Sequence, residues 1–185
     1  MKPETAVTAY LETLLWTDTY YAPEDPEADG EALEVNDDRV SFSGEIEDGT
    51  PLDQIVDVSD LDTLNPKISA AAREDLDGFA AHCEETLGFD PFLEFDETQV
   101  AHDFALSRNG HGAGFFDREG YEIEPTDEIK ALMARSWYEG AVTSKRDPSK
   151  VDVRDALQDA AKTFGTHGIM LWVKADGTIG IEDHS

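Results

Sequence analysis

Basic residues are scarce in this chain, which sets 14 lysines and arginines against 42 aspartates and glutamates over 185 residues and carries a formal charge of −28. Contact with a nucleic-acid backbone depends on cationic side chains that neutralise phosphates, so no direct nucleic-acid partner is expected. The same shortage argues against binding to an anionic membrane surface, so no membrane partner is expected either. Protein partners remain.

Cysteine is nearly absent, and long apolar runs are missing. The lone Cys83 excludes an internal disulfide and a cysteine metal cluster, and it fits a reducing, cytoplasmic location. No apolar run approaches the ~18 residues of a membrane span, and no signal peptide opens the chain. We therefore expect a soluble protein in the cytoplasm. The length favours a single domain, residues 1–185, large enough to bury a core.

Apolar residues recur at helical spacing in several stretches. They predict helices over 3–16, from an Asn65-Pro66 cap to Gly88, from Thr126 to about 140, and from 148 or 149 to 164. The second of these has the most regular stripe, which places its cysteine among buried hydrophobes rather than in a reactive site. The stripe consists of Ile68, Ala72, Leu76, Phe79, Ala80, Cys83 and Leu87.

Residues 17–64 break this pattern and form an acidic, partly irregular segment. Residues 1–64 hold 18 acidic and 2 basic side chains, so this part of the chain has too little apolar area to order along its whole length. Only 40–46, with the alternating sequence VSFSGEI, predicts a short strand. The segment is either an acidic docking arm or a solvated loop.

A glycine-containing turn predicts a β-hairpin over about 101–118. Asn109-Gly110 fits a type I′ turn, which requires positive φ at both central residues. This turn places Arg108 opposite His111, and the glycines on the other face leave room for a close neighbour such as a helix backbone. The further cross-strand pairs would be Leu106 with Ala113, Phe104 with Phe115 and His102 with Asp117.

A second hairpin is predicted over about 168–182, with Asp176-Gly177 at its turn. Isolated hairpins are marginal in water, so we expect the two to join in one antiparallel sheet. Helices would pack on one face of that sheet. The expected fold class is α+β, with the long acidic loop region in addition.

The stretch 108–118, RNGHGAGFFDR, resembles the RNGHGAGFWDR signature of a family of small, uncharacterised phage and mobile-element proteins. Phe116 stands where the family usually has Trp, and about 119–150 looks like an insertion. The resemblance implies a viral origin and a shared fold, and it brings no reaction, partner or catalytic residue with it. It covers most of the chain, since similar stretches follow in the expected order: AYLETLLWTDT, GTPLDQ at 49–54, AREDLDGFAAHC, AAKTFG and ADGTIGIED.

The acidity has three candidate causes. Few lysines, many aspartates and alanines, and acidic residues along nearly the whole chain favour adaptation of the surface to high salt, that is, halophilic adaptation. Nucleic-acid mimicry toward a basic partner is the second candidate. The ordinary acidity of phage proteins is the third.

The candidate site lies on the predicted 101–118 ribbon, and its binding residues are Arg108, Asn109, His111, Phe116 and Arg118. A catalytic version would use Arg108, His111 and Asp117, but no recognisable nucleophile accompanies them. With a rise of ~3.4 Å per residue, the ribbon holds its histidines too far apart to share an ion. Neither a metal nor another cofactor is expected.

These observations favour a non-enzymatic viral accessory protein that acts through protein–protein interaction in the cytoplasm of a host cell. The partner would be a host protein, for example a defence protein, a viral protein, or a second copy of the chain. The basic loop SKRDPSK at 144–150 is expected to pair with the chain's own acidic residues or else to contact an anion or a nucleic acid. The alternative function is a small hydrolase or nuclease-like enzyme that uses the Arg108, His111 and Asp117 ribbon.

Overall fold

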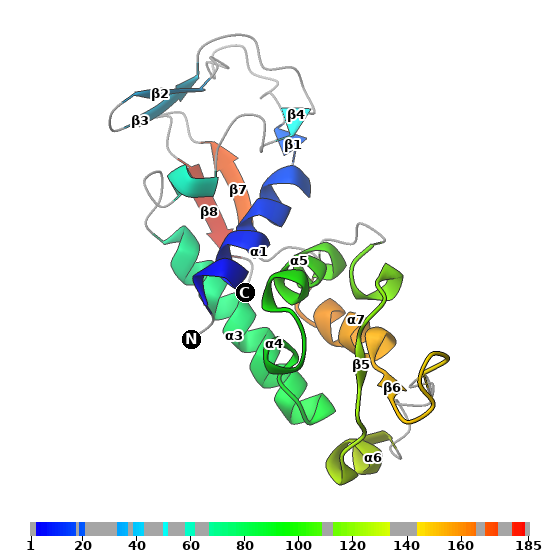
Figure 1. Ribbon diagram of the computed structural model, residues 1–185. Coiled ribbons are helices and arrows are strands. Elements are labelled where there is room, and N and C mark those ends of the chain that lie inside the picture. Colours follow the sequence, from blue (N-terminus) through cyan, green and yellow to red (C-terminus); the bar gives the residue numbers. More distant parts are fainter. Residues whose placement is uncertain are drawn as a thin grey trace.

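The structure is a computed structural model, shown in Figure 1. It describes residues 3–17, 19–20, 33–36, 39–42, 50–51, 58–61, 67–108, 113–133, 144–165, 169–173 and 179–183. The helices are α1 (Glu4–Thr17), α3 (Ile68–Leu87), α4 (Pro91–Glu94), α5 (Glu97–Arg108), α6 (Asp127–Met133) and α7 (Arg154–Lys162), with 3-10 helices η2 (Val58–Asp60) and η3 (Phe115–Asp117). The strands are β1 (Thr19–Tyr20), β2 (Leu33–Asn36), β3 (Arg39–Phe42), β4 (Thr50–Pro51), β5 (Glu122–Ile123), β6 (Val151–Asp152), β7 (Ile169–Val173) and β8 (Ile179–Asp183).

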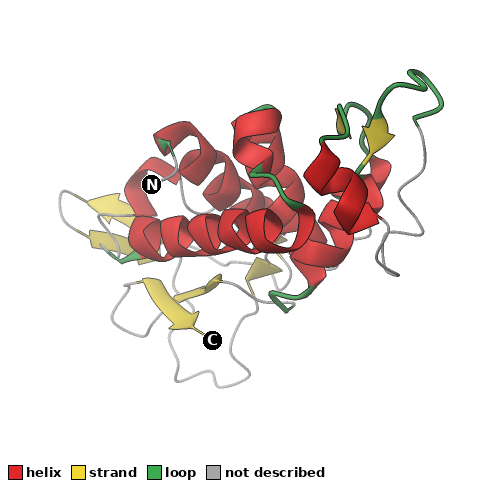
Figure 2. Ribbon diagram, turned by 90° about the horizontal axis from the view of Figure 1, so that it is seen from below, coloured by secondary structure: helices red, strands yellow, loops and turns green. Residues whose placement is uncertain are grey.

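The helices pack together in the middle of the molecule, and the strand pairs lie around them (Figure 2). α5 and α3 are the central elements: α5 contacts α1, α4, α7 and η3, and α3 contacts α1, α4, α6, α7 and β7. Within this core, Phe79 of α3 stacks on Phe104 of α5 with ring centroids 4.2 Å apart, and its ring centroid lies 5.8 Å from that of Phe115 in η3. Removing such large apolar rings from water provides much of the driving force for folding.

Helices α1 and α3 confirm two of the predicted helices. The apolar stripe predicted for α3 is buried along its whole length, including Cys83. α3 ends where Gly88 adopts a left-handed φ of +80° and donates its N–H to the carbonyls of Cys83 and Glu84. The predicted cap, Asn65-Pro66, lies outside the described residues.

The predicted hairpin over 101–118 is wrong, because most of its first strand is helix α5 and its second strand contains η3. Helix α5 is capped by Asp96, whose carboxylate accepts a hydrogen bond from the Gln99 N–H at 2.9 Å. The sequence analysis did not identify this cap, because it assigned the stretch to a hairpin on the basis of Asn109-Gly110. From Val100 to Arg108 every side chain is buried except the half-buried His102. A helix buried on all sides has no polar face, so its sequence shows no amphipathic period.

The glycine prediction from the same stretch is confirmed at Gly114. The chain returns after α5 and crosses the backbone of that helix, where a Cβ added at Gly114 would lie 2.8 Å from the Asp103 carbonyl oxygen. Its φ of +106° also favours glycine. Asn109-Gly110, the predicted turn, lies outside the described residues.

The strands form separate antiparallel pairs among the described residues: β1 with β4, β2 with β3, β5 with β6 and β7 with β8. β7 and β8 agree with the second predicted hairpin, and they pair from Ile169 opposite Asp183 to Val173 opposite Ile179. The proposed single sheet of two hairpins is wrong, because the first hairpin is not formed. The fold is mostly helical with small strand pairs, which still belongs to the α+β class.

Helices α6 and α7 overlap the two other predicted helices, and the residues directly after Met133 of α6 lie outside the described part of the chain. α6 has the predicted cap, since the Thr126 hydroxyl accepts a hydrogen bond from the Ile129 N–H at 3.2 Å. α7 starts at Arg154, later than the predicted 148 or 149. In the acidic segment, β3 overlaps the predicted strand at 40–46 and pairs with β2. Among the described helices, none is long and apolar enough to cross a membrane.

Candidate functional site

Arg108, the first predicted site residue, is part of the core. Its side chain is 8% exposed and forms an ion pair with Asp75 of α3, with 2.6 Å between Nη1 and Oδ2. It also donates to the Tyr10 hydroxyl at 3.2 Å and to the Phe164 carbonyl at 3.3 Å. Burial and the Asp75 carboxylate raise the pKa of Tyr10, so its hydroxyl stays protonated and donates to Asp75 at 2.9 Å. Arg108 therefore joins α1, α3, α5 and the end of α7.

Asp103 of α5 holds the returning chain in place. Its side chain is fully buried, and its carboxylate accepts hydrogen bonds from Arg118 Nε at 3.1 Å and from the Tyr121 hydroxyl at 2.8 Å. Burial, followed by the charge of Asp103, raises the pKa of Tyr121 and keeps this donor protonated. The predicted binding residue Arg118 thus has one nitrogen fixed to the core, although 43% of its side chain is exposed.

Gln158 of α7 holds η3, the 3-10 helix in the chain segment that returns along α5. Its Oε1 accepts from the Ser107 hydroxyl at 2.8 Å and from the Phe116 N–H at 3.4 Å. Phe115 points into the core, where its ring centroid lies 5.1 Å from that of Tyr121. Phe116 points out and is 60% exposed. The sequence FFD thus turns one aromatic ring into the core and the next one to solvent.

A cavity of about 410 Å³ lies beside Phe116, between the returning chain and the start of α7. Pairing of β5 with β6, in which Glu122 lies opposite Asp152, brings its two walls together. One wall consists of Phe116, Glu119, Gly120, Tyr121 and Glu122. The other wall consists of Lys145, Arg146, Asp152, Arg154 and Asp155.

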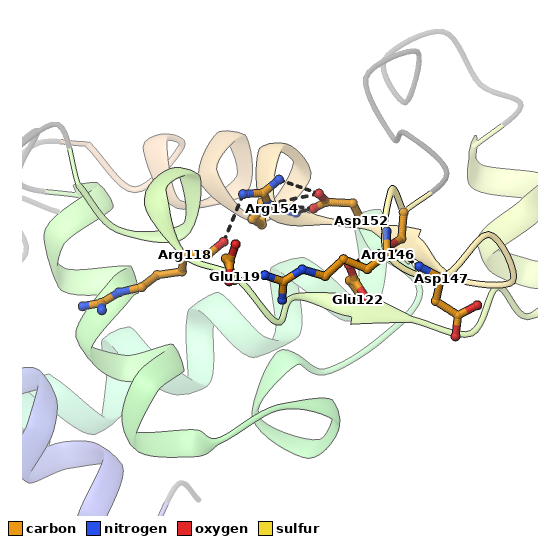
Figure 3. Close-up of polar contacts among 8 residues, drawn as sticks. Arg118, Glu119, Glu122, Arg146, Asp147, Asp152 and Arg154 are labelled. Carbon is orange, nitrogen blue, oxygen red and sulfur yellow. Dashed lines mark hydrogen bonds and ion pairs between the residues drawn. The ribbon is translucent and has the colours of Figure 1, made fainter.

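One ion pair in the cavity is held by several hydrogen bonds. Arg154 Nε donates to both carboxylate oxygens of Asp152 at 3.0 Å, and Nη2 donates to Oδ2 at 2.6 Å (Figure 3). Arg154 Nη1 also donates to the Arg118 carbonyl at 3.1 Å. Burial alone would raise the pKa of Asp152, but the hydrogen bonds and charge of Arg154 outweigh it and lower that pKa. These two residues neutralise each other.

A second ion pair at the cavity is exposed. Arg146 pairs with Glu119, and their side chains are 60% and 71% exposed, respectively. This agrees with the prediction that the 144–150 loop pairs with the chain's own acidic residues. Next to it, the Ser144 hydroxyl donates to Glu122 and accepts from the Arg146 N–H at 3.0 Å. The hydroxyl thus ties the base of the loop to β5.

The predicted site residues do not come together as a ribbon. Arg108 is buried, Phe116 and Asp117 are exposed, and Asn109 and His111 lie outside the described residues. The hairpin that was expected to align Arg108, His111 and Asp117 is not formed, because Arg108 lies on α5. A catalytic role for these three residues stays a prediction, since His111 lies outside the described residues. The sequence analysis missed the wall of the cavity formed by Asp152, Arg154 and Asp155, and the only local signal for it was the close spacing of opposite charges.

His102, predicted opposite Asp117, lies instead between α5 and α1. The Thr13 hydroxyl donates to the Ala9 carbonyl at 2.7 Å, so it accepts from His102 Nδ1, also at 2.7 Å. The His102 ring stacks on Trp16, and partial burial lowers its pKa. Within the described residues, no group of three or more His, Cys, Asp or Glu side chains could hold a metal ion.

No family model, curated protein or solved structure matches this chain. At the cavity, an aromatic ring, an exposed ion pair and a partly exposed ion pair with several hydrogen bonds lie within one concave surface. Such a surface is suited to binding rather than to proton transfer, because its best-ordered charged groups are bonded to each other.

Proposed function

We propose that this protein is a non-enzymatic interaction protein that binds a partner protein through Phe116 and the adjacent cavity. Following the resemblance of the 108–118 stretch, the partner would be a host or viral protein and the role that of a viral accessory protein in the host cytoplasm. The observation that carries the proposal is the exposure of Phe116 within a stretch whose other described residues are largely committed to the fold.

The structural roles of the residues near Phe116 in the sequence support the proposal. Arg108 is bonded to Asp75, Gly114 lies on the α5 backbone, and Phe115 lies in the core. Each therefore has a structural reason to be present. Phe116 has no such reason among the described contacts of its ring, and an exposed phenylalanine forgoes the ~1.5–3 kcal/mol that burial of its side chain provides. A binding partner would supply that burial.

The surroundings of Phe116 also support it. Aromatic side chains are enriched at the centres of protein interfaces, where surrounding polar groups exclude water from the contact. Here the exposed pair of Arg146 and Glu119 and the hydrogen-bonded pair of Asp152 and Arg154 line the cavity. The hydrolase alternative has no comparable support, because its cation, Arg108, is buried and bonded to Asp75.

A matched pair of surface variants tests the proposal. Phe116→Ser removes the aromatic ring from the cavity edge, whereas Leu93→Ser removes the 80% exposed leucine of α4, outside the cavity. The tagged full-length proteins are crosslinked in host-cell lysate, and captured proteins are quantified by mass spectrometry. We expect at least one protein to be enriched by the unchanged chain and by Leu93→Ser but lost with Phe116→Ser.

Light scattering of the purified chain covers the possibility that the partner is a second copy. In that case the unchanged chain and Leu93→Ser should be dimeric and Phe116→Ser monomeric. The proposal fails if Phe116→Ser captures the same proteins in the same amounts as Leu93→Ser and has the same mass in solution.

A further inference from the structure

The charges of the cavity divide into a fixed set and an exchangeable set. The Asp152 carboxylate accepts three hydrogen bonds from the Arg154 side chain and one from the Arg154 N–H, so these two charged groups already satisfy each other. Arg146 and Glu119 form an ion pair in which both side chains are mostly exposed. An exposed ion pair contributes only ~0–1 kcal/mol, so a guest group can replace either member at little cost.

The lining of the cavity as a whole favours a cation over an anion. The cavity is lined by four carboxylates, Glu119, Glu122, Asp152 and Asp155, against three cations, Lys145, Arg146 and Arg154. The face of the Phe116 ring is negative and attracts cations such as a guanidinium. The formal charge of −28 on the whole chain adds a long-range attraction in the same direction.

We infer that this cavity binds a basic peptide segment, with an arginine or lysine side chain held between the Phe116 ring and the Glu119 carboxylate. The inference rests on the proposed function and names the chemistry of the partner. Arg146 releases Glu119 and turns to solvent, where its charge remains hydrated. An apolar residue next to the guest cation covers the rest of the Phe116 ring, since the ring is large enough to contact both.

A chain of this charge attracts any basic peptide at low salt, so the test must separate the cavity from the overall field. At 1 M salt the screening length is ~3 Å, which removes the general attraction and leaves direct contacts. The probe is a fluorescein-labelled octapeptide with two Arg-Phe pairs separated by glycine and serine. Two control peptides replace both arginines with citrulline, which is neutral and has nearly the same shape, or with glutamate.

Binding is measured by fluorescence anisotropy at 0.15 M and 1 M sodium chloride with the full-length protein. Glu119→Gln removes the proposed carboxylate, and Glu94→Gln is the matched control on α4, outside the cavity. In 1 M salt we expect Glu119→Gln and Phe116→Ser each to weaken binding of the arginine peptide by at least about fivefold. Glu94→Gln should change it by less than about twofold, and the citrulline peptide should bind as weakly as the arginine peptide binds Glu119→Gln.

The possible failures are distinguishable. Equal affinity of Glu119→Gln and Glu94→Gln for the arginine peptide overturns the basic-peptide inference. Tighter binding of the glutamate peptide, lost in Arg146→Gln, also overturns it and makes the cavity a site for acidic segments. If no peptide binds but Phe116→Ser still loses its partner in lysate, the inference fails and the proposed function stands. If the arginine peptide binds through Glu119 but lysate capture and solution mass do not depend on Phe116, the proposed function fails instead.

Discussion

Two arginines of this chain form ion pairs that differ in burial. Arg108 pairs with Asp75 inside the core, whereas Arg73 of α3 pairs with Glu4 of α1, whose side chain is 70% exposed. Water competes for the exposed pair and screens its attraction. The buried pair is little screened, and removing one partner leaves a charge that has lost much of its hydration. The same residue type should therefore contribute very differently at the two positions.

Arg108→Met should lower the free energy of unfolding by ~3 kcal/mol, because the Asp75 carboxylate would lose its ion-pair partner and keep the Tyr10 hydroxyl as its remaining described partner. Arg73→Met is the matched control and should cost less than ~1 kcal/mol. Methionine keeps the apolar stem of both side chains, so packing changes little. The measurement is urea denaturation followed by circular dichroism. Equal losses for the two variants would contradict the structural role assigned to Arg108.

At the scale of whole elements, α3 was predictable and α5 was not. The α3 stripe is apolar on one face, and Gly88 stops it with a left-handed φ, so period and end signal agree. α5 instead buries Asp103, Ser107 and Arg108 through hydrogen bonds and ion pairs with distant segments. Those partners are distant in the sequence, so no local pattern indicates the helix. The Asn-Gly dipeptide is a local pattern, and it led to the prediction of a hairpin.

The candidate site divides in the same way. Phe116 was a predicted binding residue, because it lies within the distinctive sequence RNGHGAGFFDR at 108–118. The opposite wall of the cavity lies about 30 residues further along the chain, and only the pairing of β5 with β6 brings it next to Phe116. A register of two short strands is not encoded by any local period, because each contributes only two residues.

The contact between Gly114 and α5 can be tested against a second glycine of similar conformation. Gly114 and Gly120 have φ of +106° and +104°, respectively, so alanine is strained at both positions. A Cβ at Gly120 meets nothing within 4 Å, whereas at Gly114 it meets the α5 backbone. Gly120→Ala should therefore cost ~1 kcal/mol from backbone strain alone.

Gly114→Ala should cost at least ~1–3 kcal/mol more, because the returning chain must move off the helix to accommodate the methyl group. Urea denaturation of both variants gives the difference directly. Equal destabilisation would mean that the return does not lie against α5 as the structure has it. A further expected sign is faster proteolysis of Gly114→Ala near residues 109–118, since the return would then be less firmly held.

At the scale of the whole molecule, the acidity exceeds what the fold uses. Asp75 and Asp103 have core roles, but the outer face of α3 carries Glu74, Glu84 and Glu85 in exposed positions. With a formal charge of −28, such surface carboxylates repel one another, and that repulsion favours the expanded, unfolded chain. Salt screens it, since the screening length falls from ~30 Å at 0.01 M to ~3 Å at 1 M.

If the acidity is an adaptation to high salt, the melting temperature should rise from 0.01 M to 1 M sodium chloride, with the steepest change at low salt, where screening changes most. Reversing three exposed charges, Glu74→Lys, Glu84→Lys and Glu85→Lys, raises the formal charge from −28 to −22 and keeps residues of similar helix propensity. Because less repulsion remains to be screened, this variant should melt higher than the unchanged chain in dilute salt and show a smaller rise. Salt effects unrelated to charge act on both proteins alike and cancel in the comparison.

A melting temperature that is flat across this range, or a rise that is equal in both proteins, would rule out salt adaptation. The surplus carboxylates would then have to serve binding, which favours mimicry of nucleic acid toward a basic partner.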